Sequence, residues 1–154
     1  MVEYLSPAIR HPLVIAVDQS VADAAALMEQ ARSMGTGVFP AGDGAMEPLP
    51  LLQRGRAGCV VVMDADQVVG LLTAADVVRY GAGPRPLAQV GVAEATVRPQ
   101  RFVHVAELVA AEAVLQIGEQ TGYAPLPVLN DRGQLIGLYT VESWFWLAQQ
   151  HKSR

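Results

Sequence analysis

The feature that most constrains this chain is an internal repeat of strand, turn, strand and helix start. The first copy covers Cys59–Asp76 (CVVVMDADQVVGLLTAAD), and the second covers residues 126–143 (LPVLNDRGQLIGLYTVES). In each copy an apolar run predicts a buried strand, a polar segment predicts a turn, and a glycine-containing run predicts the partner strand. A sheet this small cannot bury both of its faces alone. The repeat therefore predicts two copies that pack against each other.

The two copies align at a constant spacing. Gly70 matches Gly137, an offset of 67 residues (137 − 70). The same offset pairs Leu71 with Leu138, Thr73 with Thr140 and Val61 with Val128. We therefore expect a mixed α/β (α+β) fold of two pseudo-symmetric repeats, each a small sheet flanked by helices.

Local signals predict the elements of the first half. Ser20 followed by Asp23 is a helix N-cap signature, as is Thr73 followed by Asp76. Residues 35–50 are rich in glycine and proline, which predicts a loop inserted into the first repeat. The predicted elements are a strand at Leu13–Val17, a helix from Val21 to about Met34, a short helix at Leu51–Arg54, strands at Cys59–Val62 and Val68–Leu72, and a helix over Asp76–Tyr80.

The second half is expected to repeat this order. The predicted elements are a short strand at Glu94–Arg98, a helix with one apolar face between Val103 and Ile117, strands at Leu126–Leu129 and Gln134–Tyr139, and a final helix from about Val141. The predicted division places the first repeat at 1–82 with an N-terminal lead-in segment, a linker at 83–91 and the second repeat at 92–154.

Composition excludes several classes of protein. Hydrophobic residues make up 51% and charged residues 17%, which predicts a folded chain. A net charge of −4 argues against a nucleic-acid binder, and no apolar run approaches the roughly 20 residues of a membrane span. The first residues lack a secretory pattern, so we expect a cytoplasmic protein. The single cysteine, Cys59, is expected to be a buried structural thiol, and the three histidines share no metal-ligand spacing.

These residues resemble a known family. The order of a short strand, a helix, V-V-V-x-D, a turn, V-x-G-L-x-T-x-x-D and a helix, repeated once, is similar to a tandem pair of cystathionine-β-synthase-type (CBS) domains, also called a Bateman module. The run VVGLLTAADVVR and the second run LPVLNDRGQLIGLYT carry the resemblance, which covers roughly residues 10–82 and 92–148. The resemblance implies a regulatory module that binds adenine nucleotides between its repeats and transmits their occupancy to a partner domain or protein.

The resemblance also implies site residues for the first cleft. The family's ribose-phosphate motif falls on Gly70, Thr73 and Asp76. An aspartate at a helix start can accept hydrogen bonds from two ribose hydroxyls, while the threonine hydroxyl and free helix N–H groups face a phosphate. The opposite repeat is expected to complete this cleft with Arg101, His104, Ala106, Tyr123 and Ala124.

The second copy departs from the family pattern. Ser143 stands where the ribose-binding acid belongs, so Thr140 and Ser143 lack a charged acceptor. The matching passage of the first repeat supplies Gln19, Ala24 and Gly58, and Arg54 and Arg56 lie close to it in sequence. We therefore expect one competent cleft at Thr73 and Asp76 and a weaker one at Thr140 and Ser143.

Plainer interpretations stay open beside these. Thr73 and Asp76 can serve as a capping pair alone, and Trp144, Phe145 and Trp146 can seal a core or a homodimer contact. No catalytic constellation or dinucleotide fingerprint is present, so we predict neither an enzyme nor a catalytic cofactor. The leading hypothesis is a homodimeric sensor of AMP, ADP or ATP, suited to energy sensing. The alternative is a structural module that dimerises or docks a partner without a ligand.

Overall fold

The computed structural model describes residues 7–35 and 49–152. The first half contains β1 (Leu13–Ala16), α1 (Val21–Gly35), α2 (Leu49–Ala57), β2 (Cys59–Asp64), β3 (Gln67–Thr73) and α3 (Ala74–Gly81). The second half contains η2 (Leu87–Gln89), α4 (Val92–Ala95), β4 (Val103–His104), η3 (Val105–Glu107), α5 (Ala111–Gln120), β5 (Leu126–Leu129), β6 (Leu135–Tyr139) and α6 (Val141–Lys152).

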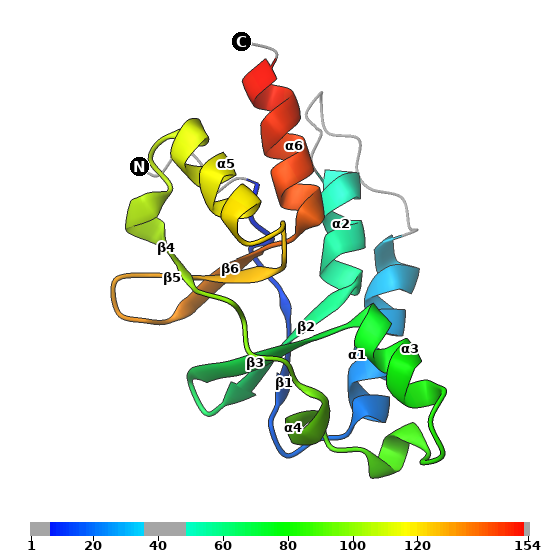
Figure 1. Cartoon of the computed structure of the whole chain (residues 1–154). Coiled ribbons are helices and arrows are strands. Elements are labelled where there is room, and N and C mark those ends of the chain that lie inside the picture. Colours follow the sequence, from blue (N-terminus) through cyan, green and yellow to red (C-terminus); the bar gives the residue numbers. More distant parts are fainter. Residues whose placement is uncertain (1–6, 36–48, 153–154) are drawn as a thin grey trace.

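The described residues form two three-stranded sheets, ordered β1-β2-β3 and β4-β5-β6, each flanked by helices (Figure 1). In both sheets the first strand runs parallel to the middle strand, and the third runs antiparallel to it. The predicted fold of two pseudo-symmetric α/β repeats is therefore confirmed.

The helix starts form as the capping signatures predict. At the start of α1 the Asp23 amide donates to Ser20 Oγ at 3.1 Å, and the Ser20 amide donates to Asp23 Oδ2 at 3.1 Å. Of the loop predicted at 35–50, residues 36–48 lie outside the described residues, while Gly35 ends α1 and residues 49–50 begin α2. The helix predicted at 51–54 thus extends further in both directions.

The predicted match of Val61 with Val128 is wrong by one residue. Val62, rather than Val61, pairs with Gly70, whereas Val128 pairs with Gly137. Val128 and Gly137 are nine positions apart (137 − 128), whereas Val62 and Gly70 are eight apart (70 − 62), and Gly133 adopts φ +77° in the longer hairpin. The extra residue between the paired positions changes the offset between the copies within a single hairpin.

Two further predictions for the second half are wrong. Residues 92–95 form α4 instead of a strand, and Val97 pairs with Leu71 of the first sheet. The first strand of the second sheet is β4, where Val103 pairs with Val128. The helix predicted from Val103 begins only at Ala111, because Val103 is already committed to the sheet.

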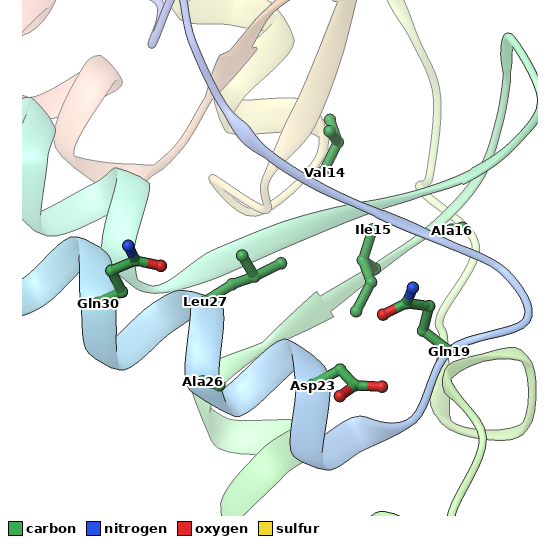
Figure 2. Close-up of a pocket in the computed structure, with 8 residues that line it drawn as sticks. All are labelled: Val14, Ile15, Ala16, Gln19, Asp23, Ala26, Leu27 and Gln30. Carbon is green, nitrogen blue, oxygen red and sulfur yellow. The ribbon is translucent and has the colours of Figure 1, made fainter.

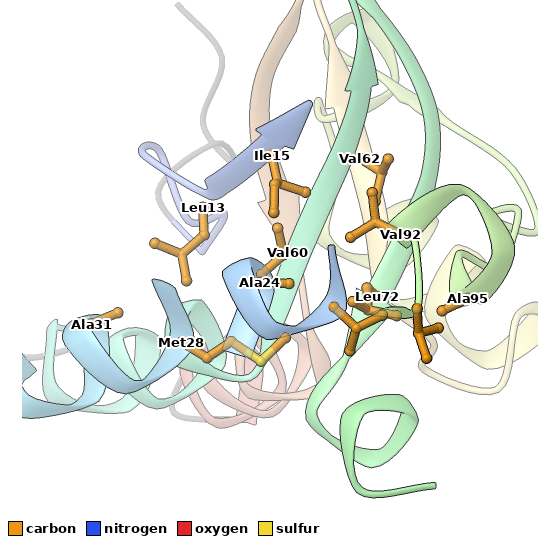
Figure 3. Close-up of a cluster of buried hydrophobic side chains, with 12 residues drawn as sticks. Leu13, Ile15, Ala24, Met28, Ala31, Val60, Val62, Leu72, Val92 and Ala95 are labelled. Carbon is orange, nitrogen blue, oxygen red and sulfur yellow. The ribbon is translucent and has the colours of Figure 1, made fainter. Parts of the chain in front are cut away.

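Three apolar clusters hold the fold together. One lies between the first sheet and α1 and includes Ile15, Val60 and Val62 (Figure 3). A second lies under the second sheet and includes Trp144, which is only 2% exposed. The predicted sealing role of that tryptophan in a core is therefore confirmed.

The third cluster joins the two repeats. It contains Val61, Leu71 and Leu138 together with Cys59, which is buried as predicted. Val61 and Cys59 alternate with Val60 and Val62 along β2, so one face of β2 packs on α1 and the other on the opposite repeat. The repeats therefore share a core, as expected for sheets that cannot bury both faces alone.

Each repeat also lends a residue to the opposite sheet. Val97 and Leu71 exchange two backbone hydrogen bonds of 2.8 Å, and Ile9 and Leu138 exchange bonds of 2.7 and 2.9 Å. Both crossings pass over the repeated glycines. A Cβ added to Gly137 would lie 3.2 Å from the Ile9 carbonyl oxygen, and one added to Gly70 would overlap the Thr96 hydroxyl. The glycines of the repeated motif therefore allow close backbone approach.

The first repeat is longer than the second between its first two strands. Ile15 pairs with Val62, 47 positions later (62 − 15), whereas Val103 pairs with Val128, 25 positions later (128 − 103). This longer segment includes α2, which packs against both α1 and α6 (Figure 1). A helix of the first repeat therefore lies against the last helix of the second. Within the described part of the chain, every helix is too short or too polar for a membrane span.

Candidate functional site

The first strand-to-helix junction is closed by a complete capping box. At Thr73 the backbone amide and the hydroxyl each donate to Asp76 Oδ2 at 2.9 Å, and the Asp76 amide donates back to Thr73 Oγ1 at 3.3 Å. Arg79 Nη2 donates to the other carboxylate oxygen, Oδ1, at 2.8 Å. Asp76 is only 7% exposed, so both of its oxygens already have partners in a largely buried position. The capping interpretation of this pair is confirmed.

The surroundings of this junction are close-packed. Thr96 covers the face of Gly70, and its hydroxyl donates to the Leu71 carbonyl oxygen at 3.2 Å. Cys59 pairs with Thr73 across the first hairpin. Burial, with a smaller contribution from the charge of Asp76, raises the pKa of the Cys59 thiol to about 12. That cysteine is therefore a neutral packing residue, as predicted.

Among the residues expected to complete the first cleft, Arg101 already has partners within its own repeat. Arg101 donates to the Phe102 carbonyl oxygen at 3.0 Å and pairs with Glu107. Partial burial raises the pKa of Glu107, but hydrogen bonds from the His104 amide and Arg101 outweigh it, so that pKa lies below its ordinary value. Ala106 and the His104 side chain are exposed. This passage forms its own capped turn.

The second junction is closed by a hydroxyl instead of a carboxylate. The Thr140 amide donates to Ser143 Oγ at 3.1 Å, and Ser143 is fully buried. The Thr140 side chain is also buried, at 4% exposure, and its Oγ1 has no hydrogen-bond partner among the described residues. A buried hydroxyl without a partner is costly, so such a group in a folded protein usually has a specific reason, such as a functional role or a bound water or ion.

A pocket of about 210 Å³ lies beside this hydroxyl and is lined by both repeats. The first repeat contributes Arg54, Gly55 and Gly58, and the second contributes Tyr123, Thr140 and Glu142. The structure thus brings together Gly58 and Thr140, as predicted for the second cleft. Tyr123, predicted for the first cleft, lines this pocket as well, close to the partly buried Ala124.

Two residues predicted for the second cleft lie elsewhere. Ala24 is fully buried in the cluster under α1 (Figure 3), so its side chain is not available to a ligand. Gln19 lines a different pocket, of about 410 Å³, between the edge strand β1 and α1 (Figure 2). That pocket is lined by the first repeat only, with Val14 and Leu27 among its walls and with Asp23, which already caps α1.

Sequence reasoning missed Gly55 and Glu142 as pocket residues. Glu142 stands one position before Ser143, and Ser143 occupies the motif position that matches Asp76. The motif therefore does not point to Glu142. For Arg54, closeness in sequence is the only signal that points to this pocket. The neighbouring Arg56 donates from Nε to the His11 carbonyl oxygen at 2.6 Å, outside the pocket lining.

Comparisons with known proteins agree with this architecture. The family model described as the CBS domain matches residues 3–83, more than half of the chain. The search of curated proteins found no match.

Solved structures of similar fold cover nearly the whole chain. One, a CBS domain named NE2398, is 22% identical with a TM-score of 0.65, covering 95% of this chain and 94% of its own. AcuB from Vibrio cholerae is 15% identical with a TM-score of 0.67, covering 99% and 94%. CBSX2, a CBS-pair protein of Arabidopsis thaliana, solved in complex with AMP, is 16% identical with a TM-score of 0.62, covering 96% of each chain. This chain therefore belongs to the CBS domain family and folds as a tandem pair of CBS repeats.

Proposed function

We propose that this chain is a regulatory module that binds an adenine nucleotide between its two repeats and passes the occupancy of that site to a partner domain or protein. The observation that carries the proposal is the pocket lined by both repeats, including Thr140, whose buried hydroxyl has no partner among the described residues. A ligand held there touches both halves, so it favours one relative arrangement of the repeats over others. The signal it can send equals its difference in affinity for those arrangements.

The fold relatives support the choice of ligand. CBSX2 was solved in complex with AMP, and its chain matches this one over almost its full length. Two strand-to-helix junctions are available to such a ligand here. The set predicted from the sequence is Thr73 and Asp76 with Arg101 and His104. The other set, Thr140 with Gly58 and Tyr123, borders the pocket.

Calorimetric titration tests the proposal. AMP, ADP, ATP and S-adenosylmethionine are titrated into the purified chain, and the melting temperature is recorded with each. We expect binding at about one ligand per chain. Stabilisation should reach about 2.7 kcal/mol at a ligand concentration one hundred times Kd, and melting should rise by several degrees. If none of the four compounds gives binding heat or a melting shift at millimolar concentration, the proposal is rejected. The alternative, a module that works without a ligand, would then be the better account.

The competing function is a dimerising or docking module without a ligand. Two observations favour it. Both carboxylate oxygens of Asp76 already accept hydrogen bonds from the protein, and the helices α3 and α6 expose apolar side chains. Val78 of α3 is 72% exposed, and Phe145 of α6 is 56% exposed. A homodimer formed through these helices would bury both. Sedimentation velocity of Phe145→Glu tests this, because a dimer that uses α6 should dissociate, whereas a monomeric wild-type chain rejects the idea.

A further inference from the structure

Glu142 is the carboxylate that the second junction leaves free. It lies in the first turn of α6 and lines the pocket between the repeats. Ser143 accepts the Thr140 amide, so the cap does not use Glu142. Among the described residues, Glu142 takes part in no hydrogen bond or ion pair. At the first junction the opposite holds, because capping and Arg79 engage both oxygens of Asp76.

A cation from the other repeat lines the same pocket. Arg54 lies in the last turn of α2, is exposed, and has no hydrogen bond or ion pair with any described residue. By contrast, Arg79 pairs with Asp76, and Arg101 pairs with Glu107. A guanidinium and a carboxylate that have no partner among the described residues suit a ligand that carries both an anion and hydrogen-bond donors.

Gly55 allows α2 to lie close to both Thr140 and Glu142. A Cβ added to Gly55 would overlap Thr140 Oγ1 and would lie 2.9 Å from Glu142 Oε1. The threonine hydroxyl and the glutamate carboxylate therefore both lie against the bare backbone of α2. The extra length of the first repeat includes α2, so this wall of the pocket depends on a segment that the second repeat lacks.

We propose that Glu142, one position before the expected acid, is the acceptor for the ligand's hydroxyl groups in this pocket, and that Arg54 binds its anionic end. The inference rests on the proposed function and assigns the ligand as a nucleoside monophosphate. Two adjacent ribose hydroxyls are suitable donors to one carboxylate, and a phosphate suits a guanidinium. The half-exposed ring of Tyr123, at 43%, offers a face for the base at the rim. The pocket, of about 210 Å³, is small for a whole nucleotide. The additional phosphates of ADP or ATP would therefore extend past Arg54 into solvent.

The test titrates AMP and adenosine into the wild type, Glu142→Gln and Arg54→Gln. Glu142→Gln should weaken both ligands by about tenfold or more, because each loses a charged acceptor. Arg54→Gln should weaken AMP by about tenfold but adenosine by less than about twofold, since adenosine has no phosphate. The matched controls are Glu112→Gln, an acid in the first turn of α5, and Arg32→Gln, a base in the last turn of α1. Both controls should bind AMP as the wild type does.

The outcomes separate this inference from the proposed function. AMP binding that Asp76→Asn abolishes and Glu142→Gln leaves intact would overturn the inference and keep the proposed function, with the site at the first junction. Equal loss of AMP and adenosine in Arg54→Gln would reject the phosphate role of that arginine. Failure of the wild type to bind either ligand would overturn the proposed function and this inference with it.

Discussion

The two strand-to-helix junctions occupy equivalent places in the fold but are capped differently. The first uses the Asp76 carboxylate, which accepts from the Thr73 amide and hydroxyl and from Arg79. The second uses the Ser143 hydroxyl, and Glu142 at the pocket has no partner within residues 7–35 and 49–152. Asp76 fits the binding motif by position, but the fold already uses its carboxylate for the cap. In the second copy Ser143 takes over the cap, so the neighbouring Glu142 is not needed for it. Whether a carboxylate at the junction is available to a ligand therefore depends on which side chain caps the helix.

Filling the contact between α2 and the second junction is expected to have one of the largest effects. Gly55→Ala should lower the free energy of unfolding by about 2 kcal/mol, because its Cβ would overlap the Thr140 hydroxyl and press on Glu142. Urea denaturation measures this. The control is Gly81→Ala at the end of α3, where nothing lies within 4 Å of the added Cβ. Equal stability of the two variants would mean that α2 does not pack tightly on the junction.

The next comparison concerns the two glycines of the repeated motif. Gly70→Ala should lower stability by about 2 kcal/mol, since its Cβ displaces the Thr96 hydroxyl from the Leu71 carbonyl and lies 3.1 Å from the Val97 carbonyl oxygen. Gly137→Ala should cost about 1 kcal/mol, because its nearest neighbour would be 3.2 Å away. Urea midpoints give the order. Combining Gly70→Ala with Thr96→Ala should recover part of the loss, and no recovery would assign the clash to the backbone.

Replacing the caps compares the junctions directly. Asp76→Ala should cost about 2 kcal/mol, because it removes the acceptor of two Thr73 donors and leaves Arg79 without its carboxylate. Ser143→Ala should cost about 1 kcal/mol, since one amide loses its acceptor. Asp76→Asn, which keeps an acceptor oxygen, should fall between these values. Thermal unfolding of the three variants checks the order, and a larger loss for Ser143→Ala would reverse the comparison.

The smallest expected effect is a pH dependence at the passage into α5. The folded-state pKa of Glu107 lies below its ordinary value, so its contribution is present above about pH 4.3 and is lost as the pH falls through the folded value. The contribution should be below about 1 kcal/mol, because the Arg101 and Glu107 side chains are each about a third exposed (35% and 31%). Glu107→Gln should therefore flatten the decline of stability between pH 5 and pH 3. An unchanged slope would reject this role.

Local patterns predicted the hairpins and helix starts because nearby atoms decide them. Ser20 with Asp23 and Thr73 with Asp76 form their predicted boxes from donors three residues apart. The continuous apolar run of β2 likewise predicted a buried strand. Errors arose where a distant partner decided the outcome. Val97 pairs with Leu71, and Val103 pairs with Val128. The spacing of apolar residues along a helix or strand does not predict either pairing.

By itself the sequence determined that this protein has two copies of one unit, where each hairpin lies, and that the chain resembles the CBS domain family. These follow from repeat spacing, apolar periodicity and capping chemistry, which act over a few residues. Which polar groups of the described residues remain without a partner depends on contacts between distant parts of the chain. Arg79 and the cap occupy Asp76, Ser143 releases Glu142, and α2 places Arg54 and Gly55 beside Thr140. The physical reason is that a hydrogen-bonding group is available to a ligand only when no neighbour satisfies it, and here those neighbours include residues of the other repeat.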